Sequence, residues 1–129
     1  MSSRRKSREL ALQLLFQEEL TQFGPDEILD TFPRLETVAH GDRDFAQFLF
    51  LQYLENRLQV DKLIRQFSQN WRLERMAVVD RNILRMAVSE FLYTDTPRVV
   101  VINEAIEIAR RFSTEDSSEF VNGILDAIR

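Results

Sequence analysis

The chain has 129 residues, a formal charge of −4, no cysteine and one histidine. The lack of cysteine excludes disulfides and thiolate metal sites, and His40 alone, in a polar stretch beside Gly41, cannot build a catalytic triad or a multi-histidine metal site. No apolar run approaches the roughly 20 residues of a membrane span, and the N-terminus lacks the apolar core of a signal peptide. We therefore expect a cytoplasmic protein with no cofactor.

Helix-favouring residues dominate the composition. Leu, Ile, Arg, Glu and Gln lose little side-chain freedom in a helix, and only three glycines and three prolines interrupt them. Only the run of Val and Ile at residues 99–102 is also compatible with a strand. We expect an all-α, single-domain fold of about six to seven helices, arranged as two packed sub-bundles over roughly residues 1–70 and 71–129.

The first predicted helix opens with a cluster of cations. Four of them precede the first acidic residue, and the rest of the chain therefore carries −8. We call these four residues the basic arm: Arg4, Arg5, Lys6 and Arg8. A local basic arm on an acidic body would meet a polyanion at one place rather than over a wide surface. The alternative interpretation is a solvated, frayed N-terminus.

Apolar spacing and helix breakers place the elements of the first half. The first helix should run to about residue 22, with an apolar arc wide enough for neighbours on more than one side. Gly24 fits a left-handed stop and Pro25 fits the first position of the next helix. That short helix covers residues 26–32, and a loop is predicted over residues 34–42.

The second half is predicted to contain four more helices. They cover residues 44–68, 71–93, 102–112 and 116–128. The first of these is long for a small domain, and we expect a kink or break near residues 59–61. Pro97 predicts a turn before the third, and Ser113 and Asp116 bracket the predicted cap of the last.

The sequence offers no catalytic constellation. Carboxylate pairs at helical spacing, such as Glu104 with Glu107, have no second catalytic feature and are interpreted as solvated faces. There is no Gly-rich phosphate loop, no H-E-x-x-H and no G-x-S-x-G, so we do not expect an enzyme. Asn103, Asn122 and Gly123 stand in apolar helical stretches. We interpret the amides as ties between helices and Gly123 as permitting close helix contact, with direct ligand contact as the alternative.

Asp116 and Phe120 lie four residues apart and share one face of the last predicted helix. An exposed aromatic side chain beside a basic arm is suited to single-stranded nucleic acid, because bases stack on the ring while cations neutralise phosphates. The alternative is that Phe120 belongs to the core. Glu74 and Asp80 lie off the apolar stripe of residues 71–93, where their simplest role is solubility.

Four segments together resemble the NusB family of transcription antitermination factors. They are residues 4–13, 71–85, 101–109 and 120–126. The resemblance covers nearly the whole chain in the same order and is weakest over residues 21–42. It implies an all-helical fold of two packed sub-bundles and an RNA-binding adaptor without enzymatic activity. It also implies pairing with NusE, a small-subunit ribosomal protein, and joint binding of the boxA element of nascent RNA to help RNA polymerase pass terminators.

The resemblance also assigns roles to individual residues. It implies RNA contacts for the whole basic arm, that is Arg4, Arg5, Lys6 and Arg8, and for Asp116 and Phe120. Asp80 and, less closely, Glu74 resemble positions that face NusE. Phe16 stands where the family usually shows tyrosine, so a hydroxyl contact to RNA would be lost while stacking could survive. Some members of the family form homodimers that bury the RNA face.

Two other functions remain open from the sequence. The same fold resembles the N-terminal accessory domain of a ribosomal RNA cytosine methyltransferase, although the chain ends at Arg129 with no cofactor-binding domain, which favours the stand-alone factor. The other is a helical protein-interaction module with no RNA role. If all four arm cations bind RNA, affinity should fall with salt at a log–log slope of roughly −3. Alanine at Arg5 and Arg8 should then weaken RNA binding and leave thermal unfolding nearly unchanged.

Overall fold

The computed structural model describes residues 3–32, 39–68 and 71–128. Within these ranges the protein is all-helical, as predicted, and contains no strand. The elements are α1 (Ser3–Thr21), α2 (Pro25–Thr31), α3 (His40–Glu55), α4 (Arg57–Phe67), the 3-10 turn η2 (Leu73–Arg75), α5 (Val78–Tyr93), α6 (Arg98–Phe112) and α7 (Glu115–Ala127). The run at residues 99–102 lies in α6, so the strand alternative is wrong.

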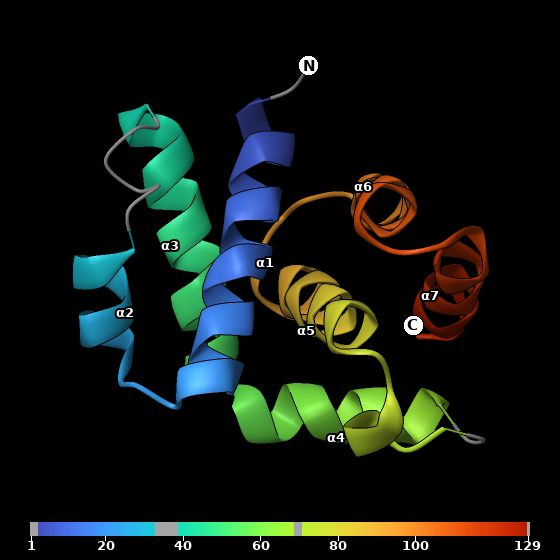
Figure 1. Cartoon of the computed structure of the whole chain (residues 1–129). Helices are drawn as coiled ribbons and strands as arrows, with labels where there is room; N and C mark the ends of the chain where they lie inside the picture. The colour runs from blue at the N-terminus through green and yellow to red at the C-terminus, as the bar shows by residue number, and fades with distance from the viewer. Residues whose placement is uncertain (1–2, 33–38, 69–70, 129) are drawn as a thin grey trace.

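Helix α1 lies at the centre of the N-terminal half, and α2, α3 and α5 pack around it (Figure 1). Leu10, Leu12, Leu14 and Leu15 are all buried, which confirms neighbours on more than one side, whereas Phe16 and Leu20 of the predicted apolar arc are exposed. Helices α1 and α3 run in the same direction (Figure 1). The Ser7 hydroxyl near the start of α1 accordingly donates to a carbonyl at the start of α3, at 2.9 Å.

Helix α5 is the central helix of the C-terminal half. It contacts α1, α3, α4, α6 and α7. Of its predicted apolar stripe, Ile83, Met86 and Ala87 are at most 3% exposed and Val79 is partly buried, whereas Met76 is buried but precedes the helix. Helix α4 packs on α3 and also on α5 and α7, so it touches both halves of the chain. The division into sub-bundles at residue 70 stays a prediction.

Several predicted boundaries were wrong in the first half. The break in the long helical segment falls at Asn56 rather than at residues 59–61, and α3 already begins at His40. Asn56 leaves helical geometry, and its amide donates to the Gln52 carbonyl at 2.9 Å. The left-handed residue after α1 is Gln22, not Gly24, which instead precedes Pro25 in extended geometry. The predicted loop at residues 34–42 lies largely outside the described residues.

The segment before α5 departs from the prediction of one helix over residues 71–93. It contains only the η2 turn, and Met76 has extended backbone before α5 begins at Val78. The guanidinium of Arg81 donates to the carbonyls of Leu73 and Met76, at 3.1 and 2.9 Å. These bonds satisfy backbone oxygens that a continuous helix would have paired internally.

The amides interpreted as ties between helices do not lie between helices. Asn103, Asn122 and Gly123 are all exposed. A methyl group added at Gly123 would meet no described atom within 4 Å, so the prediction that this glycine permits close helix contact is wrong. The cap of α7 is Thr114, which lies between Ser113 and Asp116 as predicted, and its hydroxyl accepts from the Ser117 amide. Within the described ranges, no helix is long and apolar enough to cross a membrane.

Candidate nucleic-acid interface

The four cations of the basic arm occupy the first two turns of α1, and their environments differ. Arg4 and Lys6 are exposed, Arg5 is partly exposed and Arg8 is buried. Helix spacing does not explain the difference, because residues 4 and 8 lie on one side of the helix, yet Arg4 is exposed and Arg8 is buried. The alternative interpretation of a solvated, frayed N-terminus is wrong for residues 3–8, which are helical and include the buried Arg8.

Arg8 is held in an ion pair with Glu90 near the end of α5. Its Nε and Nη2 atoms donate to the two carboxylate oxygens at 2.7 and 2.8 Å. The two side chains are only 5% and 1% exposed. A two-bond arginine–carboxylate pair satisfies both partners, whereas removing one partner leaves an uncompensated buried charge. In the free protein Arg8 therefore joins α1 to α5. Contact between Arg8 and RNA stays a prediction, and the buried ion pair disfavours it.

Arg5 is paired in a more accessible way. Its Nε donates to Glu104 of α6 at 2.7 Å, with the arginine side chain 33% exposed. The hydrogen bond and the charge of Glu104 raise the pKa of Arg5 above its usual value. Glu104 is only 14% exposed, so water screens the pair less than it screens a surface pair. An RNA phosphate that replaced the carboxylate as the partner of Arg5 would leave Glu104 unpaired.

The outward side chain of Phe16 borders a hollow between α1, α2, α5 and α6. This hollow, here called the Phe16 hollow, has a volume of about 320 Å³. Its lining combines apolar side chains with amide groups: Leu12, Phe32, Val79 and Phe112, with Gln13, Gln17 and Asn82. Phe16 and Phe112 are 38% and 43% exposed, so each offers part of a ring to solvent. Partly exposed aromatic rings edged by amides suit a nucleobase, and Glu9 adds one carboxylate to the lining.

A second hollow lies against the start of α7 and contains three of the predicted site residues. It has a volume of about 400 Å³, and we call it the α7 groove. Asp80, Asp116 and Phe120 line it together with Trp71, which is 58% exposed. The Trp71 and Phe120 rings meet edge to face, with centroids 5.9 Å apart. The first turn of α5 separates the groove from the Phe16 hollow, since Val79 borders one and Asp80 the other.

Asp80 lies off the predicted apolar stripe, which suggested a solvated side chain, but the structure buries it. It is 7% exposed, and one carboxylate oxygen accepts from the Ser117 hydroxyl at 3.0 Å. The other oxygen is buried and has no hydrogen-bond partner among the described residues. Asp80 lies in the first turn of α5, where the helix dipole favours a negative charge. It therefore joins α5 to α7 at the inner wall of the α7 groove.

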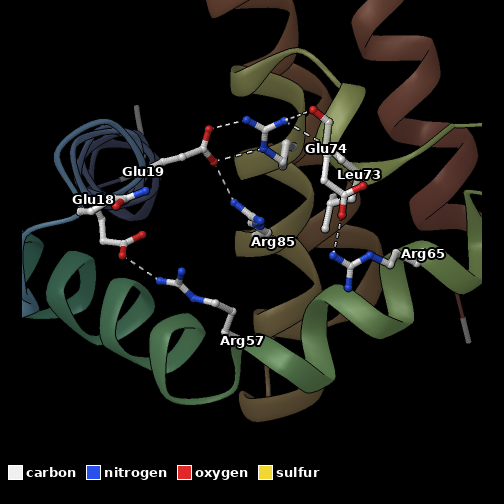
Figure 2. A pocket seen from close by; sticks show the side chains of 9 residues that line it. Glu18, Glu19, Arg57, Arg65, Leu73, Glu74 and Arg85 are labelled. Atoms are coloured by element: carbon white, nitrogen blue, oxygen red, sulfur yellow. Dashed lines mark hydrogen bonds and ion pairs between the residues drawn. The ribbon is translucent and has the colours of Figure 1, made fainter.

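Glu74 lies in a separate, charged pocket of about 500 Å³ (Figure 2). It is exposed and accepts from Arg65 of α4 at 2.8 Å, and this bond lowers the pKa of its carboxyl group. Glu19 of α1 accepts from both Arg81 and Arg85 of α5 in the same pocket. Burial alone would raise the pKa of Glu19, but the hydrogen bonds and charges of these two arginines lower it overall. The cluster fastens the end of α1 to α5.

Sequence reasoning missed several aromatic residues near the predicted contacts. Trp71, Phe112, Phe45 and Phe48 were not among the candidate site residues. Trp71 and Phe112 are exposed at the two hollows, and Phe45 lies beneath the Arg4 guanidinium, whose central carbon is 3.8 Å from the ring centroid. A usable signal for Phe45 and Phe48 was their spacing of three, which places both rings on one face of a helix.

The sequence and the fold of this chain resemble those of known proteins. The family model described as the NusB family matches residues 5–129. The chain belongs to the NusB family. Two relatives from this family, both called transcription antitermination protein NusB, illustrate the likeness. That of Koribacter versatilis is 48% identical over 128 residues, with 98% of this chain and 88% of the relative covered. That of Geobacter sulfurreducens is 45% identical over 130 residues, with 99% and 94% covered.

Solved structures of NusB proteins share the fold. NusB from T. maritima is 41% identical, with a TM-score of 0.88 over 97% of this chain and 89% of that chain. A crystal structure of the antitermination factors NusB and NusE in complex with dsRNA has a TM-score of 0.86 over 99% of this chain and 96% of the matched chain. Its identity is 24%, so this second likeness supports the fold alone.

Proposed function

We propose that this protein is a transcription antitermination factor that binds boxA-type RNA together with NusE and so supports ribosomal RNA transcription by RNA polymerase. Membership of the NusB family over residues 5–129 is the observation on which the proposal rests. The relatives are transcription antitermination proteins by name, and a protein of the same fold has been crystallised with NusE and RNA. The protein acts in the cytoplasm, as an adaptor that binds without catalysing a reaction.

The exposed part of the basic arm supplies the first contact with RNA in this proposal. Arg4 and Lys6 are exposed, and Arg5 can exchange Glu104 for a phosphate. The remaining surface is acidic overall, so electrostatic attraction guides a polyanion to this end of α1. Arg8 keeps its neighbours in place through Glu90 and does not need to leave that pair.

The two hollows beside the first turn of α5 supply the remaining contacts. Phe16 offers a ring for stacking at one hollow, and Phe120 with Asp116 contacts the strand at the α7 groove. Asp80, on the inner wall of that groove, and Glu74, exposed at the neighbouring pocket, face NusE. The partner and the strand therefore meet around the start of α5.

Capture of labelled single-stranded boxA RNA, with and without NusE, tests this proposal. We expect capture by the protein alone and stronger capture with NusE. The chain offers a matched control, because its only two lysines, Lys6 and Lys62, are both exposed but lie on α1 and α4. Lys6→Ala should weaken capture, whereas Lys62→Ala should not. Equal effects of the two variants would contradict a local contact at the arm, and preference for the same sequence in duplex form would contradict a single-stranded target.

A further inference from the structure

A third hollow lies beside the basic arm, and its aromatic lining has no role in the RNA and NusE contacts described above. It opens between the starts of α1, α3 and α6 and the turn after α5, with a volume of about 470 Å³. Its lining includes Arg4, Phe45, Phe48, Tyr93, Val100 and Glu104. We call it the Phe48 hollow. It adjoins the arm directly, because Arg4 belongs to the arm and Glu104 is the partner of Arg5.

Three planar groups lie next to one another along one side of this hollow: the Arg4 guanidinium, the Phe45 ring and the Phe48 ring. The Arg4 guanidinium carbon is 3.8 Å from the centroid of Phe45, within the range of a cation–π contact. The Phe45 and Phe48 rings are stacked, with centroids 6.2 Å apart and planes inclined by 19°. Phe48, at the outer end, is 41% exposed. Among the described residues, no further aromatic ring stacks on Phe48.

We propose that the Phe48 hollow is a nucleobase subsite, in which one unpaired base of the bound RNA stacks on the free face of Phe48 while Arg4 engages an adjacent phosphate. The inference rests on the proposed function and adds to it a place for one base. Aromatic stacking accepts any base, because every base has a π-face, and a cation at the rim holds the backbone. The Phe48 hollow provides both the aromatic ring and the cation.

The charges around the hollow favour a base over an apolar side chain from a protein partner. Two carboxylates line the hollow. Glu104 accepts from Arg5 in the free protein, whereas Asp95 is exposed and its oxygens can accept hydrogen bonds from the amino groups of a base. An apolar side chain would offer Asp95 no donor. Val100, 40% exposed on α6, supplies an apolar wall opposite α3.

Titration of labelled single-stranded boxA RNA at several salt concentrations tests the subsite. Phe48→Ala should weaken binding about five- to hundred-fold, the range expected for losing one stacked base. Its salt slope should stay that of the wild type, because no ion contact is removed. Phe48→Trp should bind about as well as the wild type. Phe23→Ala is the matched control, because Phe23 is 48% exposed at the far end of α1.

A second titration uses RNAs that each lack one base. The loss of one particular base should weaken binding to the wild type and have little further effect on Phe48→Ala, because both changes remove the same stack. If removing a base weakened binding to the wild type and to Phe48→Ala by the same factor at every position, the subsite would be overturned.

The outcomes separate this inference from the proposed function. If Phe48→Ala binds like the wild type while Lys6→Ala is weaker, the subsite is wrong and the arm stands. If the wild type shows no salt-dependent RNA binding, both are wrong. If Phe48→Ala changes the oligomeric state in sedimentation while RNA binding stays the same, the hollow is a contact between copies of this chain and the subsite is overturned.

Discussion

Arg8 and Glu90 form a two-bond ion pair that is almost entirely out of solvent and joins the start of α1 to the end of α5. The pair gives one member of the basic arm a structural role. Arg8 also lies near the Phe45 ring of α3, as Arg4 does, with guanidinium carbons 5.7 and 3.8 Å from the ring centroid.

Arg8→Ala should destabilise the protein. Glu90 would remain as a buried, unpaired carboxylate, and breaking a buried pair in this way costs about 3–5 kcal/mol. Urea unfolding measures the change, with Arg4→Ala as a control that should shift the unfolding free energy by less than about 1 kcal/mol. The double replacement Arg8→Met with Glu90→Leu should recover most of the loss. A stability loss no larger than that of Arg4→Ala would contradict the burial of the pair. This expectation replaces the sequence-based one, in which alanine at Arg5 and Arg8 would leave thermal unfolding nearly unchanged.

Glu19→Gln should cost stability in a pH-dependent way. The pKa of Glu19 is lowered in the folded protein, so its carboxylate contributes stability above its unfolded pKa, near 4.5, and this contribution is lost as pH falls through the lowered folded value. At pH 7 we expect a loss of about 1–3 kcal/mol, because Arg81 and Arg85 lose a charged partner. The difference from the wild type should shrink below pH 4.5. Urea unfolding between pH 7 and pH 3 measures it, and the exposed Glu55→Gln serves as control. A constant difference across this range would contradict the ionised bridge.

Trp71 should report on occupation of the α7 groove. It is the only tryptophan of the chain, is 58% exposed and contacts Phe120. When NusE and RNA bind, burial of the indole should move its fluorescence emission to shorter wavelength. Phe120→Ala should weaken complex formation, while Phe23→Ala provides the control. Formation of the complex with an unchanged emission spectrum would place the groove outside the interface.

Phe16→Ala should weaken RNA binding with little loss of stability. Its ring is 38% exposed, so removing it leaves only a shallow defect in the core, while the lost stacking should reduce affinity about five- to hundred-fold. Phe16→Tyr restores the residue usual in the family and should bind at least as well as the present chain. Fluorescence anisotropy with single-stranded RNA gives the affinities, and thermal unfolding gives the control. Equal binding by Phe16→Ala and the wild type would remove Phe16 from the interface.

Local patterns predicted the helices well where neighbouring residues decide the structure. The apolar arc of α1, the start of α2 at Pro25 and the turn before α6 at Pro97 all follow from local spacing or from the fixed geometry of proline. The predictions were wrong where distant residues decide. The helix predicted from residue 71 starts instead at Val78. Arg81, which pairs with Glu19, 62 residues away, binds the backbone carbonyls of the non-helical segment before α5.

The same limit explains what the sequence could tell about the site. A run of cations identifies a basic arm, but its members look alike until their partners are known. Arg8 is buried because of Glu90, which is 82 residues away, and Arg5 is paired because of Glu104, 99 residues away. The convergence of Asp80, Asp116 and Phe120 on one groove likewise depends on how α5 packs against α7. No spacing within a single helix contains that information.

The salt dependence of RNA binding tests the central claim most directly. Three arm cations can reach phosphates without breaking the buried pair, so the log–log slope for single-stranded boxA RNA should be about −2, and Lys6→Ala should reduce its magnitude by about 0.7. A slope of about −3 would mean that Arg8 also leaves Glu90 to bind RNA. A slope near zero, unchanged by Lys6→Ala, would contradict the claim that the start of α1 is where this protein holds RNA.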